Sequence, residues 1–271
     1  MTSRVPSERR PISAKAEPGV QGTPARRPSN RPKSPRRRKG MLTALDMALI
    51  VAIAIVLLLL AEPIWSVVSL VLQAVDIGIS GLHMAGEVTF TVIYTCAFVG
   101  AFYGVGRRRR RVAWKRVGLV KPKTRAVSMG LIAGIAAYTI VGLVDGAVST
   151  SLGRALVDNP RVFAAGYVPT WYTTTLSLIV STAIVPFIEE FFFRGLLLGW
   201  LKDRIPVIPA VVISALAFAA YHQNWDYLLS LFAFGLILGW VFLRTKSLWP
   251  AVLAHGAYNL VIDLYGFLSP G

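Results

Sequence analysis

Residues 177–200 read SLIVSTAIVPFIEEFFFRGLLLGW, a membrane-length apolar run that contains Glu189, Glu190 and Arg194. A charged side chain near the centre of a bilayer costs at least about 2.5–3.5 kcal/mol on insertion scales. Packing alone would not maintain three such groups within six residues, and ionisable groups inside a membrane are functional candidates by default. The run therefore predicts a transmembrane helix that carries a functional polar site.

The composition of the whole chain agrees with this prediction. Of its 271 residues 55% are hydrophobic and 15% are charged, against about 25% charged residues in soluble domains. Several apolar runs reach about 20 residues, enough for a helix to cross a bilayer. We expect an all-α, polytopic bundle of about seven transmembrane helices, at 41–61, 87–106, 127–148, 172–201, 206–221, 227–243 and 248–267. The stretch 63–85 could be interfacial or an eighth span. In the third span, Gly130 and Gly134 have the GxxxG spacing that favours close contact with another helix.

The net charge of +16 is unevenly distributed and divides the chain into three parts. Residues 1–40 hold twelve Lys and Arg, two Glu and seven of the sixteen prolines, which predicts a disordered basic tail. No aromatic residues interleave these charges, so we expect contact with anionic lipid headgroups and not with nucleic acid. The N-terminal spans and a basic loop occupy 41–126, and the core of the protein occupies 127–267.

The basic residues also predict the orientation of the spans. Ten Lys and Arg lie between positions 107 and 125, and cytoplasmic loops carry such an excess. The tail, this loop, Lys202, Arg204, Arg244 and Lys246 all fit one side, which places the N-terminus in the cytoplasm and the loop 149–171 outside. The run 41–61 is too long for a signal peptide and is expected to remain as an anchor. The single Cys96 is expected to be a small buried hydrophobe.

Three spaced motifs lie in separate apolar helices: Glu189-Glu190-x-x-x-Arg194, Phe218-x-x-x-His222 and His255-x-x-x-Asn259. Residues four apart share a helix face, so Glu190 can pair with Arg194 while Glu189 points about 100° away. At about 1.5 Å per residue, Glu189, His222 and His255 lie about 20, 24 and 16 Å from the basic ends of their helices. The three helices can therefore bring a carboxylate, two imidazoles and an amide to one layer inside the membrane.

Two hydrolytic mechanisms are compatible with these residues. Glu189, His222 and His255 resemble a zinc ligand set with an open position for water, so Zn²⁺ is a possible cofactor. Alternatively, Glu189 takes a proton from water while the histidines and Asn259 orient the water and hold the developing oxyanion. The chain has no HExxH, no GxGxxG and no phosphate-binding loop motif, which excludes an ordinary zincin helix and the common nucleotide-binding motifs.

The order of the three motifs resembles the CPBP (Abi) family of type II CAAX prenyl endopeptidases and their bacteriocin-processing or immunity relatives. The resemblance covers roughly 127–267 and is strongest in 177–260. It implies an intramembrane endopeptidase of a bacterial plasma membrane that acts on membrane proteins or peptides. It also implies a catalytic centre formed by Glu189, Glu190, Arg194, His222, His255 and Asn259, with Phe218 as packing that shapes the site.

Two functions of other classes stay open at this point. Buried Glu, His and Arg residues also serve transporters and proton relays, although the chain shows no inverted repeat with paired broken helices. A non-catalytic membrane scaffold that docks partners through the basic tail is the third possibility. Loss of proteolysis on replacement of Glu189 separates the first function from the other two.

Overall fold

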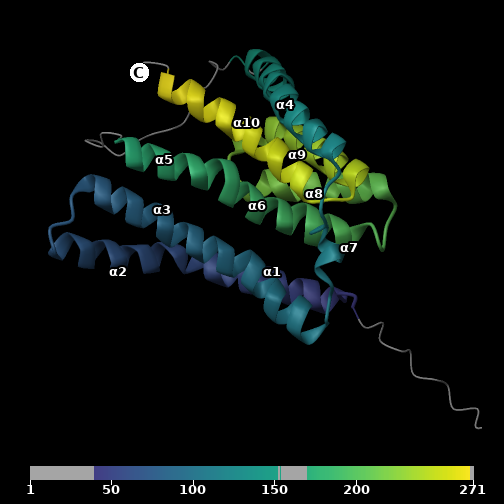
Figure 1. Ribbon diagram of the computed structural model, residues 1–271, viewed down its shortest axis with the longest axis horizontal. Helices are drawn as coiled ribbons and strands as arrows, with labels where there is room; N and C mark the ends of the chain where they lie inside the picture. The colour runs from purple at the N-terminus through teal and green to yellow at the C-terminus, as the bar shows by residue number, and fades with distance from the viewer. Residues whose placement is uncertain (1–39, 152, 154–169, 269–271) are drawn as a thin grey trace, which may run out of the picture. The chain divides into compact units, whose positions relative to one another are not determined.

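The computed structural model describes residues 40–151, 153 and 170–268, with side chains placed as far as residue 265. The expected basic tail and most of the expected external loop 149–171 lie outside these residues. Within the described ranges every regular element is helical, and no strand occurs. The all-α class is therefore confirmed, and Figure 1 shows the order of the helices along the chain.

The N-terminal part contains three long helical segments before a basic connection. Helix α1 spans Ala44–Leu59, α2 spans Ala61–Ala74 and α3 spans Ile79–Thr95. Helix α3 continues through the π-helical turns η1, Cys96–Gly100, and η2, Phe102–Arg109. A short 3₁₀ turn, η3 at Trp114–Val117, follows them. The stretch 63–85 forms no helix of its own, because it contributes the end of α2, a turn and the start of α3.

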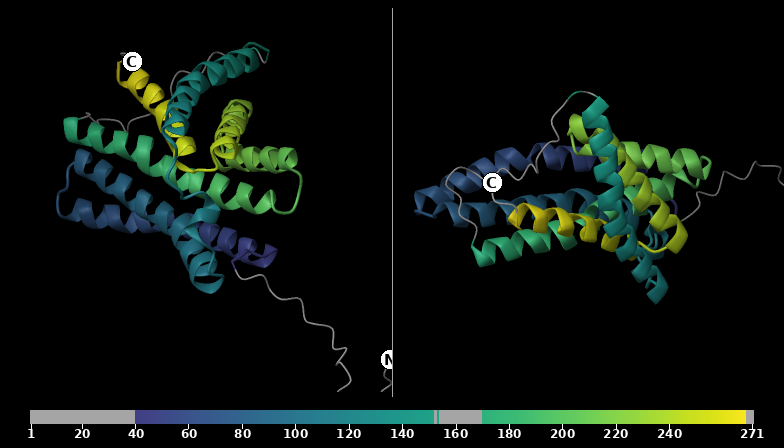
Figure 2. Two further views of the ribbon diagram at one scale, coloured as in Figure 1. Left: turned by 45° about the vertical axis from the view of Figure 1, so that its right-hand side comes forward. Right: turned by 90° about the horizontal axis from the view of Figure 1, so that it is seen from above.

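The C-terminal part contains the motifs. Its elements are α4 (Thr124–Ser151), α5 (Trp171–Ile179), η4 (Val180–Ile184), α6 (Val185–Glu190), η5 (Phe191–Leu198), α7 (Gly199–Leu201), α8 (Val207–Tyr221), η6 (Trp225–Tyr227), α9 (Leu228–Thr245) and α10 (Trp249–Leu268). The segments from α5 to α7 form one run of 31 residues (Figure 1). Figure 2 shows the same helices from two further directions.

Among the described residues, five helical runs are long and apolar enough to cross a membrane: Ala44–Ala74, Ile79–Arg109, Thr124–Ser151, Trp171–Leu201 and Trp225–Thr245. Helix α8 is apolar but shorter, and the 20-residue α10 occupies the seventh expected position. The protein is therefore an integral membrane protein with several spanning helices. Runs of 31 residues measure about 46 Å, longer than the hydrocarbon core of about 30 Å.

Two glycines bring α4 into close contact with α10. Gly130 and Gly134 are buried, and a Cβ on them would lie 2.4 Å from the carbonyl oxygen of Pro250 and 2.3 Å from that of Ala254. Small residues spaced by four allow the backbones of two membrane helices to approach closely. The packing role predicted from the Gly130/Gly134 spacing is confirmed, and α10 is held by backbone contact at the level of His255.

The helical run with the two glutamates is widened on both sides of α6. Pro186, in the first turn of α6, has no N–H to donate to the carbonyl of Thr182 four residues earlier, and the π-helical η4 precedes it. The carbonyl of Thr182 faces Gly256 of α10, where a Cβ would lie only 2.0 Å from the oxygen. This close approach joins the run to α10 one residue beyond His255.

One expectation about the core is wrong. Cys96, expected as a small buried hydrophobe, is exposed on the surface of η1. A cysteine in an apolar run tolerates contact with lipid as well as with protein, and the sequence pattern does not distinguish these environments. Cys96 is therefore accessible at the protein–lipid boundary.

Candidate active site

The pairing predicted for Glu190 and Arg194 is present in the middle of the bundle. Nη1 of Arg194 lies 2.9 Å from Oε1 of Glu190, and the two side chains are 1% and 0% exposed. Nη2 of Arg194 donates to the carbonyl of Gly235 on α9 at 3.2 Å. A buried ion pair requires such additional hydrogen bonds to offset the cost of removing both charges from water.

Glu190 also fixes the orientation of His255. Oε1 of Glu190 accepts a hydrogen bond from Nδ1 of His255 at 3.0 Å. Because an ionised carboxylate can only accept, Nδ1 carries the proton. In the neutral ring Nε2 then has a free lone pair, and it points toward Glu189. Glu190, Arg194 and His255 thus form one connected polar network that links the helical run Trp171–Leu201 to α10.

A second backbone contact gives His222 the same tautomer. Nδ1 of His222 lies 2.8 Å from the carbonyl oxygen of Phe218, so this nitrogen donates and Nε2 is left as an acceptor. His222 caps the C-terminus of α8, and Gln223 follows it with a φ of 52°. The left-handed residue ends the helix and leaves the His222 side chain 28% exposed.

Glu189 faces the two unprotonated nitrogens. Its Oε2 lies 3.8 Å from Nε2 of His222 and 4.0 Å from Nε2 of His255. The same oxygen is buried, and among the described residues no group donates a hydrogen bond to it. Three acceptors therefore converge on one small space, and a species that supplies protons or positive charge, such as water or a cation, would satisfy them.

Phe218 shapes the site by packing, as predicted. Its ring centroid lies 4.6 Å from that of His222 and 5.8 Å from that of His255. The guanidinium of Arg194 lies 4.4 Å from the same centroid, a favourable position for a cation over an aromatic face. Phe234 of α9 adds an edge contact to His255 at 5.2 Å. The aromatic shell holds both imidazoles against Glu189.

Asn259 lies beside this cluster but makes a different contact. Its Nδ2 donates to the carbonyl of Ser181 in η4 at 2.8 Å, and the hydroxyl of Ser181 also bonds to Asp263 of α10. Asp263 is buried. The structure therefore brings Glu189, His222 and His255 together, while Asn259 is placed about one helical turn from His255 on the same side of α10.

A cavity of about 820 Å³ opens next to the cluster. Its walls include Phe218, His222, His255 and Asn259 and the acidic residues Asp145 and Asp263. Ser230 of α9 donates to Asp145 of α4 at 3.4 Å. Such a volume lies within the range of cavities that hold small ligands or short peptide segments.

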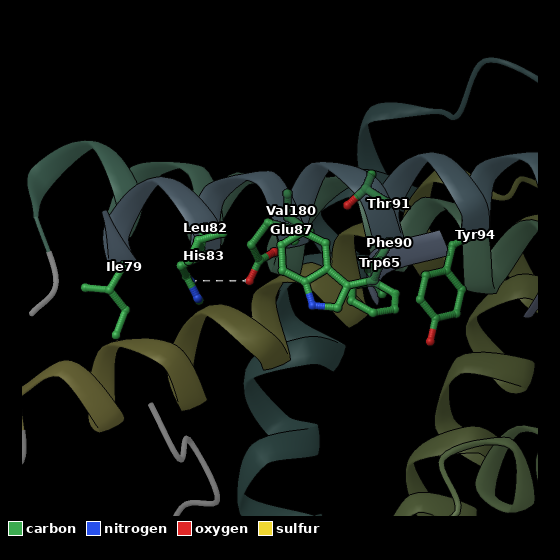
Figure 3. A pocket seen from close by; sticks show the side chains of 11 residues that line it. Trp65, Ile79, Leu82, His83, Glu87, Phe90, Thr91, Tyr94 and Val180 are labelled. Atoms are coloured by element: carbon green, nitrogen blue, oxygen red, sulfur yellow. Dashed lines mark ion pairs between the residues drawn. The ribbon is translucent and has the colours of Figure 1, made fainter. Parts of the chain in front are cut away.

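A second cavity, of about 540 Å³, lies between α2, α3 and the run that begins with α5. Figure 3 shows its apolar side chains Trp65 and Phe90 beside His83 and Glu87, which are 3.8 Å apart. Tyr94 also lines this cavity, and its ring lies 6.5 Å from that of Tyr221, the neighbour of His222. No residue of the three motifs is among those described as lining it.

The donor types fit a hydrolytic metal, but their spacing is wide. Two ligand atoms at about 2.0–2.1 Å from a tetrahedral zinc are about 3.4 Å apart, less than the 3.8 and 4.0 Å found here. Within residues 40–151, 153 and 170–268, no group of three or more His, Cys, Asp and Glu side chains is placed to hold a metal ion as it stands. The orphaned Oε2 of Glu189 and two lone pairs nevertheless give the donor chemistry that zinc requires.

Several residues of the site could not be identified from spacing. Gly235, Phe234 and Ser181 contact motif residues from other helices. Gly256 follows His255 in α10 and faces the carbonyl of Thr182. None belongs to an i,i+4 pair with a titratable partner. Gly235 and Gly256 carry a weak signal, since a glycine inside an apolar helix suggests close packing.

The comparisons with known proteins concern the same part of the chain. Residues 170–261 match the family model described as type II CAAX prenyl endopeptidase Rce1-like. The chain is 31% identical over 87 residues to the putative membrane peptidase YdiL of Bacillus subtilis, covering 32% of this chain and 36% of that protein. It is 28% identical over 93 residues to the membrane-embedded CAAX protease MroQ of Staphylococcus aureus, covering 32% and 38%. No solved structure matches the chain significantly.

The matches therefore span little more than a third of the length of the curated relatives. The family-model match includes all three motifs, because Glu189, His222 and Asn259 lie between positions 170 and 261. The resemblance inferred from the motifs is confirmed over residues 170–261, which are similar to the type II CAAX prenyl endopeptidase Rce1-like family model.

Proposed function

We propose that this protein is an intramembrane endopeptidase in which Glu189 accepts a proton from the water molecule that attacks a peptide bond. The observation that carries the proposal is the position of Glu189. A buried carboxylate oxygen without a donor among the described residues faces the Nε2 atoms of two histidines. Water placed between them donates one proton to Glu189, and its oxygen becomes the nucleophile.

The remaining residues position this reaction. Glu190 accepts from Nδ1 of His255 and pairs with Arg194, so His255 presents Nε2 to the water in a fixed orientation. His222 does the same from the end of α8. When the peptide bond breaks, the proton held by Glu189 passes to the leaving amine. Asn259 lines the cavity, and we assign to its second N–H the role of holding the developing oxyanion.

A bound metal is an alternative for the same space. Glu189, His222 and His255 would hold a zinc ion, since they supply one carboxylate and two imidazole nitrogens. When bound, zinc would polarise the scissile carbonyl and lower the pKa of water. Glu190 would then keep its role, because the partner on Nδ1 sets the orientation of a metal-ligating histidine.

The substrate is a peptide or protein that reaches the cavity from the membrane or its surface. The family model and the CAAX protease of Staphylococcus aureus suggest CAAX-type processing, and peptide maturation and immunity to a bacteriocin are the alternatives. We place the protein in a bacterial plasma membrane with its N-terminus in the cytoplasm, where the basic residues 107–125 touch anionic headgroups.

The test is cleavage of a pooled peptide and membrane-protein library by the purified, reconstituted protein, read by mass spectrometry. Wild type is compared with Glu189→Gln, with and without a strong chelator. A loss of at least about 100-fold in the variant, with cleavage kept under chelator, supports the metal-free mechanism. If the chelator abolishes cleavage and added zinc restores it in wild type but not in the variant, the result supports the metalloprotease mechanism. Cleavage by both proteins without distinction would refute the role of Glu189.

A further inference from the structure

The basic residues outside the tail gather at one end of the helical bundle. Arg116 lies 3.5 Å from Asp203, and Arg204 donates to the carbonyl of Leu42 at 2.5 Å. A small cleft between these elements is lined by Lys115, Arg116, Lys202 and Lys246, among others. We call this end of the bundle the basic end. It comprises the start of α1, η3, the end of α7 and the α9–α10 turn.

Backbone contacts join the same segments. The N–H of Gly40 donates to the carbonyl of Arg110 at 3.0 Å, and the N–H of Leu248 donates to the carbonyl of Gly118 at 2.8 Å. Arg110 also lies 2.7 Å from the buried Asp46 of α1. Four separate parts of the chain therefore meet at one end of the bundle and present their positive charges there.

The opposite ends of the same helices carry almost no positive charge. The described turns at 75–78 and 222–227 contain no Lys or Arg. The connection 152–169 contains two, Arg154 and Arg161, in its sequence. Cytoplasmic loops are enriched in Lys and Arg, so the asymmetry identifies the basic end as the cytoplasmic one.

The catalytic cavity lies at the end away from these charges. Helix α4 leaves the basic end at Thr124, and its lining residues lie in its second half, from Tyr138 to Asp145. Helix α9 returns to the basic end at Thr245, and its lining residues, from Ser230 to Phe234, lie in its first half.

The other walls follow the same rule. Helix α8 begins just after Arg204 and contributes Phe218 and His222 at its far end. The connection to α9 contributes Asn224 and Tyr227. Helix α10 begins at the basic end and lines the cavity from His255 to Tyr265. Apart from His255 and Tyr258, which lie in the first half of α10, these lining residues belong to the half of the bundle opposite the basic end.

We propose that the catalytic cavity opens on the extracytoplasmic side of the membrane, and that the substrate is a polypeptide segment that has already crossed it. The statement about the substrate rests on the proposed endopeptidase function, whereas the orientation of the cavity follows from charge and topology alone. A CAAX sequence that stays on the cytoplasmic side would not reach the cavity. Exported peptides and the extracytoplasmic ends of membrane proteins would reach it.

Cysteine labelling of the full chain in living cells tests the orientation without relying on activity. In a Cys96→Ser background, single cysteines replace Asn224 at the cavity, Trp225 beside it, which is 71% exposed, or Lys115 at the basic end. A charged, membrane-impermeant maleimide is added to intact cells and, separately, to inside-out vesicles. We expect labelling of the Asn224→Cys or Trp225→Cys variants in intact cells, and loss of labelling for Lys115→Cys there.

The reverse order, with the cavity positions labelled only in inside-out vesicles, would overturn the proposal. Labelling of both classes of position in intact cells would overturn it as well, because it would mean mixed orientation. Trp225→Cys decides the outcome where Asn224→Cys reacts in neither preparation, since its side chain is more exposed than that of Asn224.

A cleavage measurement separates this proposal from the proposed function. An impermeant fluorogenic peptide, selected from the library that the purified protein cleaves, is added to intact cells that carry wild type or Glu189→Gln. Cleavage by wild-type cells alone supports both proposals. Cleavage seen only with inside-out vesicles overturns the orientation and keeps the function. If external labelling succeeds while the purified protein cleaves no library member, the function fails and the orientation stands.

Discussion

The helical runs Ala44–Ala74 and Trp171–Leu201 have the same length of 31 residues but differ in how much of each is buried inside the protein. The first is more apolar, yet 28% of its most apolar window is buried, against 44% in the second. In a membrane the apolar solvent surrounds the protein, so apolar side chains can face outward without cost. The comparison shows that the more apolar of the two runs is the less buried one, so hydropathy alone does not predict which helix lies inside the bundle.

Each of the two runs also contains one buried carboxylate paired with Arg. Asp46 lies near the start of α1, accepts from the N–H and hydroxyl of Thr43 at 2.9 and 2.6 Å, and pairs with Arg110 at the basic end. Glu190 lies deep in its run and shares one oxygen between Arg194 and His255. The first pair fastens the end of a helix, and the second orients a side chain of the site.

The largest effect on stability is expected from Arg194→Met. The substitution leaves Glu190 as an unpaired buried charge, which typically costs about 3–5 kcal/mol. The free energy of unfolding, measured by SDS titration in mixed micelles, gives the result. The double variant Glu190→Gln/Arg194→Met removes both charges, so we expect it to recover part of the loss. An additive loss in the double variant would contradict the coupling.

A pair of apolar substitutions sharpens the contrast between the two runs. Ile188 is 2% exposed, whereas Leu59 is 73% exposed. Replacement of Ile188 by alanine opens a cavity in a packed interior, with an expected loss of about 2 kcal/mol or more. Leu59→Ala changes a surface position, for which about 0.5 kcal/mol or less is expected. Equal losses in the same titration would mean that Leu59 is covered by protein in the membrane.

The contact between η4 and α10 gives a prediction for both stability and activity. Gly256→Ala places a Cβ 2.0 Å from the carbonyl oxygen of Thr182, so α10 must move together with its neighbour His255. Such overpacking costs about 1–3 kcal/mol, and we expect cleavage to fall more than protein stability alone explains. Gly104→Ala is the matched control, since no atom lies within 4 Å of its Cβ and Gly104 does not line the cavity. Wild-type cleavage by Gly256→Ala would show that α10 yields without moving His255.

Among the substitutions of buried residues, the smallest effect is expected from Asp46→Asn. The change keeps the shape of the cap on α1 but weakens the pairing with Arg110, a loss of about 1–2 kcal/mol for a charge-assisted hydrogen bond. Cleavage by the folded variant should match that of wild type, because Asp46 belongs to the basic end and not to the cavity. A large fall in cleavage without a fall in stability would contradict this expectation, because it would show that the basic end influences the catalytic cavity.

The fold could be predicted at the level of spans but not at the level of their packing. Apolar runs gave helices at each expected position, and the Gly130/Gly134 spacing predicted a close helix contact without naming α10 as the partner. The widened turns on both sides of α6 and the continuous runs of 31 residues were not predicted, because period and hydropathy change little between an α-helix and a π-helical turn.

The sequence by itself determined which residues share a helix face. Spacings of four paired Glu190 with Arg194 and turned Glu189 away from them, since the period of the helix is a local property of the backbone. Charge excess alone also indicated the cytoplasmic end. Only the tertiary structure decided that Glu189 faces the Nε2 atoms of both His222 and His255, that Glu190 holds His255, and that Asn259 bonds to Ser181. These contacts join residues 33–78 positions apart, and their geometry depends on how closely the helices pack at glycines such as Gly256.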